Sequence, residues 1–61
     1  MIYKTLLLNF HQIKYEGTSL KQAKAEAIRA GFESVIYQDE QPILSYSPVG
    51  GWRGLSISSM G

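Results

Sequence analysis

The first ten residues of the chain carry apolar side chains mainly at even positions. These are Ile2, Leu6, Leu8 and Phe10, with Tyr3, Thr5 and Asn9 between them. A period of two is typical of a strand with one buried face. The parity changes at Ile13 and Tyr15, and no glycine or proline lies between them and Phe10. We therefore expect one long strand with a β-bulge near residues 9–12, rather than a tight hairpin.

Helical periodicity follows from residue 20 to residue 30. The apolar residues of this segment form one stripe, at positions 20, 23, 27, 28 and 30. Ser19 and Gln22 form a capping box, in which the Ser19 hydroxyl accepts the Gln22 amide and the Gln22 side chain reaches back to the Ser19 amide. Gly31 is expected at the C′ position in the left-handed conformation, with Phe32 folding back on the final turn.

Two further strands are predicted at residues 34–38 and 43–47, from their β-branched and aromatic content. The turn between them spans residues 39–42, so the pair forms a hairpin. Residues 52–57 are a candidate last strand, and residues 58–61 are a candidate loose tail.

The predicted order is β-α-β-β, with a possible fourth strand. It gives a single α+β domain over residues 1–57, with one helix packed on a small mixed or antiparallel sheet. A right-handed parallel crossover is expected through the helix. The other sheet face is expected to be uncovered, with one face of the hairpin and four further residues on it: Tyr3, Leu7, Ile13 and Tyr15.

The length of 61 residues makes the core of such a domain marginal, because a chain of this size buries only about 60% of its unfolded surface. The chain has no cysteine and its single histidine is His11, which excludes disulfides and makes a structural zinc site implausible. A partner chain is the remaining means of this kind, so we expect a homodimer or binding to another protein. Without a partner, the domain would need unusually good packing or would have low stability.

The composition bears on the expected cellular compartment and on the expected kinds of partner. No apolar run approaches the ~20 residues of a membrane span, so we expect a cytoplasmic protein with no membrane contact. The net charge of +1 argues against a strong, sequence-independent grip on nucleic acid. Binding to nucleic acid is therefore not favoured as the main role.

Catalytic chemistry is not expected. His11 is expected to be a partly exposed strand or bulge residue, and the sequence contains no nucleophile motif to accompany it. Asp39 and Glu40 lie in a predicted turn exposed to water, which does not offer the cleft that paired-carboxylate catalysis needs. We predict no enzyme activity, no cofactor and no metal site.

The candidate partner-binding residues are aromatic or cationic. Trp52 and Arg53 lie between glycines, and both residue types are enriched at interface hot spots. Three tyrosines complete this set: Tyr3, Tyr15 and Tyr46. An alternative site would bind an anion such as phosphate at the helix N-terminus. Its candidate residues are Ser19, Lys21, Lys24 and Arg29.

The segment from Gly17 to Lys24, GTSLKQAK, followed by a hairpin and a glycine before Trp52, resembles small phage- or mobile-element-encoded β-α-β-β proteins, including some anti-CRISPR proteins. The resemblance implies stoichiometric inhibition by binding a host protein or nucleoprotein complex, and it implicates Lys21, Lys24 and Trp52. The low number of lysines and the Gly-Gly turn depart from that group and leave the target open.

Together these observations predict a non-enzymatic protein-binding module, in the role of a phage or mobile-element inhibitor. Two alternatives remain open. One is a phosphate- or nucleic-acid-binding module that uses the helix N-terminus and the basic residues. The other is a small bacterial protein that self-associates.

Overall fold

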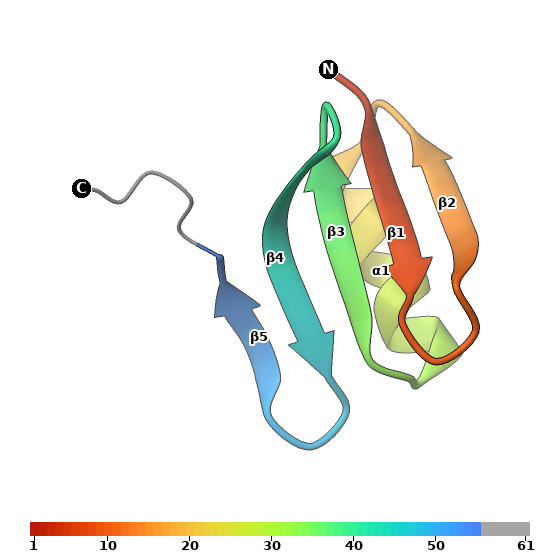
Figure 1. Ribbon diagram of the computed structural model, residues 1–61, viewed down its shortest axis with the longest axis vertical. Coiled ribbons are helices and arrows are strands. Elements are labelled where there is room, and N and C mark those ends of the chain that lie inside the picture. Colours follow the sequence, from red (N-terminus) through yellow and green to blue (C-terminus); the bar gives the residue numbers. More distant parts are fainter. Residues whose placement is uncertain (56–61) are drawn as a thin grey trace.

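A computed structural model describes residues 1–55 of the chain. Within this range five strands and one helix follow in the order β1 (Tyr3–Leu7), β2 (Gln12–Gly17), α1 (Leu20–Ala30), β3 (Ser34–Gln38), β4 (Gln41–Ser47) and β5 (Gly51–Gly54). The strands form one sheet in the order β2-β1-β3-β4-β5. Figure 1 views this sheet face on, with α1 behind it. The predicted α+β domain is confirmed, with one more strand before the helix.

The predicted long first strand is wrong, because the chain turns back after β1. The Phe10 amide donates to the Leu7 carbonyl over 3.3 Å, which closes the turn. His11 takes a left-handed backbone conformation, with φ of 50°, which is more usual for a glycine in a turn. A hairpin therefore forms without glycine or proline, and His11 is a turn residue rather than a strand residue.

The β-bulge exists, but it lies in β2 rather than near residues 9–12. Thr5 pairs with Tyr15, whereas the next residue, Leu6, pairs with Ile13. Lys14 is therefore the extra residue on the bulged strand. The shift places Tyr15 and Ile13 on opposite faces of the sheet although both have odd numbers.

Every neighbouring pair of strands in this sheet is antiparallel. The helix connects β2 to β3, and both strands run antiparallel to β1, which lies between them. β2 and β3 are thus parallel to each other without being paired. The two strands that the helix connects are parallel, as expected, but they are not neighbours, and every pair of neighbouring strands in the sheet is antiparallel.

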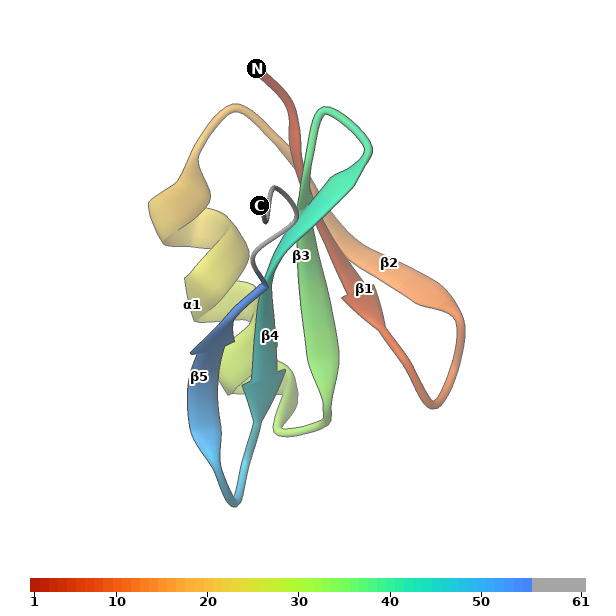
Figure 2. The ribbon, with the colours of Figure 1, turned by 60° about the vertical axis from the view of Figure 1, so that its left-hand side comes forward.

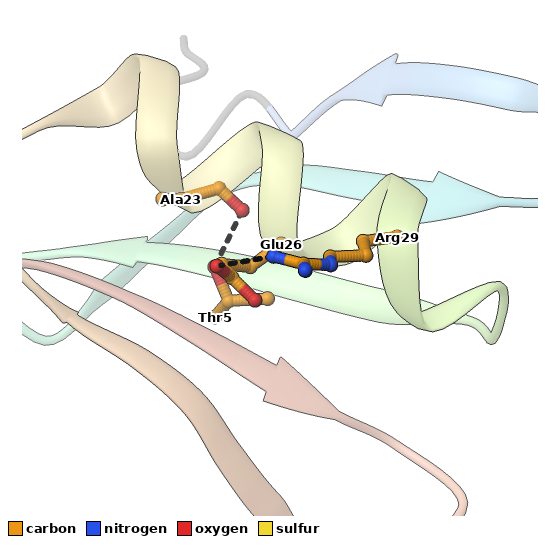
Figure 3. Close-up of polar contacts among 4 residues, drawn as sticks. All are labelled: Thr5, Ala23, Glu26 and Arg29. Atoms are coloured by element: carbon orange, nitrogen blue, oxygen red, sulfur yellow. Dashed lines mark hydrogen bonds and ion pairs between the residues drawn. The ribbon is translucent and has the colours of Figure 1, made fainter.

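The helix covers the odd-numbered face of β1, which reverses the predicted burial of that strand. Thr5 and Leu7 are buried, whereas the expected core residues Leu8 and Phe10 are exposed. The Thr5 hydroxyl donates to the Ala23 carbonyl of α1 over 2.8 Å (Figure 3). Thr5 is buried without an unpaired polar group, because the helix packs closely and its Ala23 carbonyl accepts the hydroxyl.

Small side chains make this close packing between the helix and the sheet possible. Ala23 and Ala27 are fully buried, and they face Thr5 and the fully buried Ile36 of β3. The apolar stripe of the helix is narrower than predicted, because Ile28 is 53% exposed. The helix also carries a weak ion pair along its surface, between Glu26 and Arg29, whose charged atoms are 4.0 Å apart (Figure 3).

Both ends of α1 are capped by the predicted residues. The Gln22 amide donates to the Ser19 hydroxyl oxygen over 3.2 Å. The Ser19 amide donates to the Tyr15 hydroxyl over 3.3 Å, so the tyrosine takes the place expected of the Gln22 side chain. Gly31 is left-handed, with φ of 75°, and its amide donates to the Ala27 carbonyl. Local sequence therefore fixes the helix boundaries.

Phe10, in the β1–β2 turn, and Phe32, after the helix, lie against each other. Phe32, expected to fold back on the helix, packs edge to face against Phe10, with ring centroids 5.1 Å apart. This contact joins the β1–β2 turn to the segment that follows the helix.

The predicted hairpin of β3 and β4 is confirmed with a shorter turn. Only Asp39 and Glu40 lie between the paired residues Gln38 and Gln41, and both have positive φ, 50° and 71°. Asp39 also holds the start of the chain, since its amide donates to the Ile2 carbonyl and its carboxylate accepts the Ile2 amide, each over 2.9 Å.

The last predicted strand is present as β5. It pairs with β4 without a register shift, and the Leu55 amide continues the pairing by donating to the Ile43 carbonyl over 2.9 Å. The predicted residues 56–57 of this strand and the predicted tail, 58–61, lie outside the described residues.

Candidate functional site

The helix covers only one face of the sheet, and it packs against β1, β2 and β3 (Figure 1). Residues that pair directly across antiparallel strands lie on the same face. One row on the face away from the helix takes one residue from each strand: Ile13, Leu6, Val35, Ser45 and Arg53. A second row consists of Glu16, Lys4, Tyr37 and Pro42. The described residues place no element over these two rows.

The apolar part of this uncovered face lies over β2, β1 and β3. We call it the open-face patch, and it comprises Leu6, Ile13, Val35 and Tyr37. Ile13 is 47% exposed, an unusual degree for an isoleucine in a strand. Leu6, Ile13 and Tyr37 line a shallow depression of about 240 Å³, which Lys4 and Glu40 border. The patch is therefore a slightly concave apolar surface with charges at its margin.

The charges around the patch have both signs. Lys4 lies directly opposite Glu16 on the neighbouring strand. These two residues, with Ile2, Asp39 and Glu40, line an adjoining hollow at the end of the sheet. Arg53 lies at the other side of the same face, on β5. The margin of the open-face patch is thus mainly acidic at one corner and basic at the opposite side of the sheet, where Arg53 lies.

Trp52 lies on the opposite face of the sheet from Arg53, because adjacent residues of a strand point to opposite faces. Its ring is 4.8 Å from the ring of Tyr46, at an angle of 47°. The Lys24 ammonium lies 5.2 Å from the Trp52 ring centroid, within the range of a cation–π contact. Figure 2 shows how β5 curls toward the side of the sheet that carries α1.

The aromatic residues predicted to bind a partner are therefore not on one surface with Arg53. Tyr3, Leu7 and Tyr15 were expected on the uncovered face, but they share the helix side with the buried Thr5. The reason is the reversed parity of β1 and the bulge in β2. Tyr15 instead supports the helix start through Ser19. Ile13 alone of the four expected residues faces outward on the open face.

The residues of the alternative anion site are also spread apart. Ser19 uses its hydroxyl on the Gln22 amide, and Lys24 extends over Trp52. Arg29 lies ten residues after Ser19, about 15 Å along the helix axis. Lys21 is exposed in the first turn. The four residues do not converge on one position.

Two general features of residues 1–55 bear on other kinds of site. Within that range no three histidine or acidic side chains lie close enough together to hold a metal ion. The one helix found there has neither the length nor the hydropathy that crossing a bilayer would require.

Comparisons of the chain with protein-family models, with curated proteins and with solved structures find no match. The anti-CRISPR-type resemblance therefore stays a prediction, and the function has to be argued from the geometry of the surfaces.

Three residues of the open-face patch, Leu6, Val35 and Tyr37, were not named as site residues from the sequence. Leu6 belongs to the apolar even positions of residues 2–10, and Val35 and Tyr37 share one face of β3. Alternation along one strand does not tell which of its two faces the helix covers.

Proposed function

We propose that this chain is a small, non-enzymatic protein-binding module whose contact surface is the open-face patch. The exposure of Ile13 carries the proposal, because it lies in a continuous apolar surface with Leu6, Val35 and Tyr37. Contiguous apolar surface bordered by polar groups marks interaction sites in soluble proteins. A partner that covers the patch removes this surface from water.

The composition of the face favours a protein partner over a nucleic acid. Lys4 is flanked by Glu16 and Glu40, and Arg53 is the other cation of the two rows. A phosphate backbone that reached Lys4 across this face would come close to the carboxylates of Glu16 and Glu40, which would repel it. A protein with an apolar centre and a mixed-charge rim is complementary to the same arrangement.

Charge also sets the orientation of the partner in this proposal. The acidic corner and Arg53 lie on opposite sides of the patch, so a partner with the reverse distribution docks in one direction. Stoichiometric inhibition of the bound protein, which the anti-CRISPR-type resemblance implies, is one use of such a surface, and we include it in the proposal.

The test compares two isoleucines of similar exposure, Ile13 on the open face at 47% and Ile28 on the helix at 53%. The tagged wild-type chain, Ile13→Lys and Ile28→Lys are used to capture proteins from the source cells. The captured protein is then purified, and its affinity for each chain is measured by calorimetry. Circular dichroism checks that each variant is folded.

We expect Ile13→Lys to weaken binding by at least about tenfold, because it places an unpaired ammonium in a desolvated contact. Ile28→Lys should bind as the wild type does. Equal affinity of all three chains for the captured protein would remove the open-face patch from the function. Strongly salt-dependent binding to nucleic acid, unaffected by Ile13→Lys, would favour the nucleic-acid alternative instead.

A further inference from the structure

A second surface, separate from the open-face patch, lies along β5 at the edge of the sheet. β5 pairs with β4 on one side, and within residues 1–55 no strand pairs with its other side. Such an edge presents unpaired amide and carbonyl groups to an incoming strand.

The hydrogen bond from the Leu55 amide to the Ile43 carbonyl defines which groups face outward. In an antiparallel pair, the residues of one strand point their amide and carbonyl groups alternately toward and away from the neighbour. Leu55 points toward β4, so Arg53 and Gly51 do as well. The backbone groups of Trp52 and Gly54 therefore point outward.

The two edges of the sheet differ in their protection against pairing. β2, at the other edge, has a bulge at Lys14, and Lys14 and Glu16 are both exposed. A bulge and charged side chains are the usual means by which proteins block an edge. β5 pairs without a register shift, and it begins and ends with glycine. At Gly54 an added β-carbon would meet nothing within 4 Å.

We propose that β5 pairs with β5 of a second copy of this chain, antiparallel and about a two-fold axis, to form one continuous sheet through both copies. The inference goes beyond the proposed function, because the edge of β5 is not part of the open-face patch.

The side chains of β5 select the register of this pairing. A register centred on Arg53 would place two guanidinium groups directly opposite each other, which is destabilising. In the register centred on Trp52, Arg53 lies opposite the partner's Gly51, and Trp52 lies opposite the partner's Trp52. Aromatic residues that face each other across strands stabilise the pairing.

The edge is also held in place before a partner arrives. Tyr46 packs against the Trp52 ring, and the Lys24 ammonium lies over it. Ordering this strand therefore costs little further entropy on association. Pairing with a second copy also suits the size of the chain, because few apolar side chains within residues 1–55 are fully buried: Ala23, Ala27 and Ile36. Domains this small commonly gain stability by oligomerisation.

The experiment uses two substitutions at one position. Gly54→Pro removes the outward amide but none of the hydrogen bonds to β4, and Gly54 does not have a positive φ that proline would violate. Gly54→Ala keeps the amide and is the matched control, since there is open space for its β-carbon. Sedimentation equilibrium over a concentration series gives the dimer dissociation constant, and circular dichroism verifies the fold.

We expect reversible dimers of the wild type and of Gly54→Ala, and a dissociation constant at least about tenfold higher for Gly54→Pro. If Gly54→Pro does not fold, a synthetic chain with an N-methylated Gly54 amide replaces it. A wild type that is monomeric at every concentration overturns the proposal, and so does a Gly54→Pro dimer as tight as that of Gly54→Ala.

Ile13→Lys separates this inference from the proposed function. It should leave the dimer intact while weakening the capture of another protein. A dimer lost in Ile13→Lys and retained in Gly54→Pro would place self-association on the open face and overturn the pairing through β5.

Discussion

Ile36 is the largest side chain within residues 1–55 that is completely buried, so its truncation tests the packing of the helix on the sheet directly. It lies on β3 between Thr5 of β1 and Leu44 of β4, its two cross-strand neighbours. Ile36→Ala removes three carbon atoms, each worth about 0.8 kcal/mol of burial, or about 2.4 kcal/mol in all. The cavity left behind adds to this, for a total of about 3–4 kcal/mol.

The loss is large against the stability that the length of the chain allows. A domain of this size has a free energy of unfolding of about 3–9 kcal/mol. Ile36→Ala should therefore lower the urea midpoint by about 2–3 M or leave the chain unfolded in water. The milder Ile36→Val, expected to cost about 1 kcal/mol, gives a measurable transition in either case.

Urea unfolding, followed by circular dichroism and by the fluorescence of Trp52, measures these changes. The matched control is Val35→Ala, one residue earlier on β3 but on the uncovered face, and it should cost less than about 1 kcal/mol. If Val35→Ala costs as much as Ile36→Ala, the assignment of the two faces is refuted.

Three further substitutions test separate local features. Gly17→Ala should destabilise the fold by about 1–3 kcal/mol in urea unfolding, because its β-carbon would overlap the Tyr15 phenol. Glu40→Gly should raise the stability in thermal unfolding by about 0.5–1 kcal/mol, because φ of 71° strains any residue with a β-carbon. Lys24→Met should keep the aliphatic packing, lose the cation–π contact with Trp52 and cost about 0.5–1 kcal/mol, measured by urea unfolding.

Each of these has a control in the chain. Gly54→Ala, where there is open space, should change the stability by less than about 0.5 kcal/mol in dilute protein. Gln41→Gly, next to the turn but in a strand, should lower stability where Glu40→Gly raises it. Lys21→Met, in the first helical turn, should leave the unfolding transition followed by the fluorescence of Trp52 unchanged. A Gly17→Ala chain as stable as wild type would contradict the close approach of Tyr15.

The sequence predicts those parts of the fold that depend on neighbours in the chain. The helix caps at Ser19 and Gly31 were correct because each cap is formed within a few residues. The hairpin around Asp39 was correct for the same reason. The turn at His11 was missed, because a left-handed histidine carries no compositional signal comparable to glycine.

The choice of buried face could not be made from the first strand alone. Over residues 2–10 the even positions are more apolar than the odd ones, yet Thr5 is buried and Leu6 faces outward. What decides it is the packing of Thr5 against the distant helix, where its hydroxyl donates to the Ala23 carbonyl. Alternation along one strand does not encode that contact. The same limit applies to the site. Trp52 was proposed as a site residue from its residue type, but its contact with Lys24 depends on how the sheet curls.

The position of β1 between β2 and β3 has a consequence for the growing chain. The hairpin with β2 is complete once Gly17 has been made, whereas the other neighbour of β1 ends only at Gln38. During synthesis the side of β1 that will receive β3 is therefore open while the helix is still being added. Until residues 34–38 pair with it, this side of β1 is exposed to other molecules, and a chain held at that stage of folding should misassemble more often.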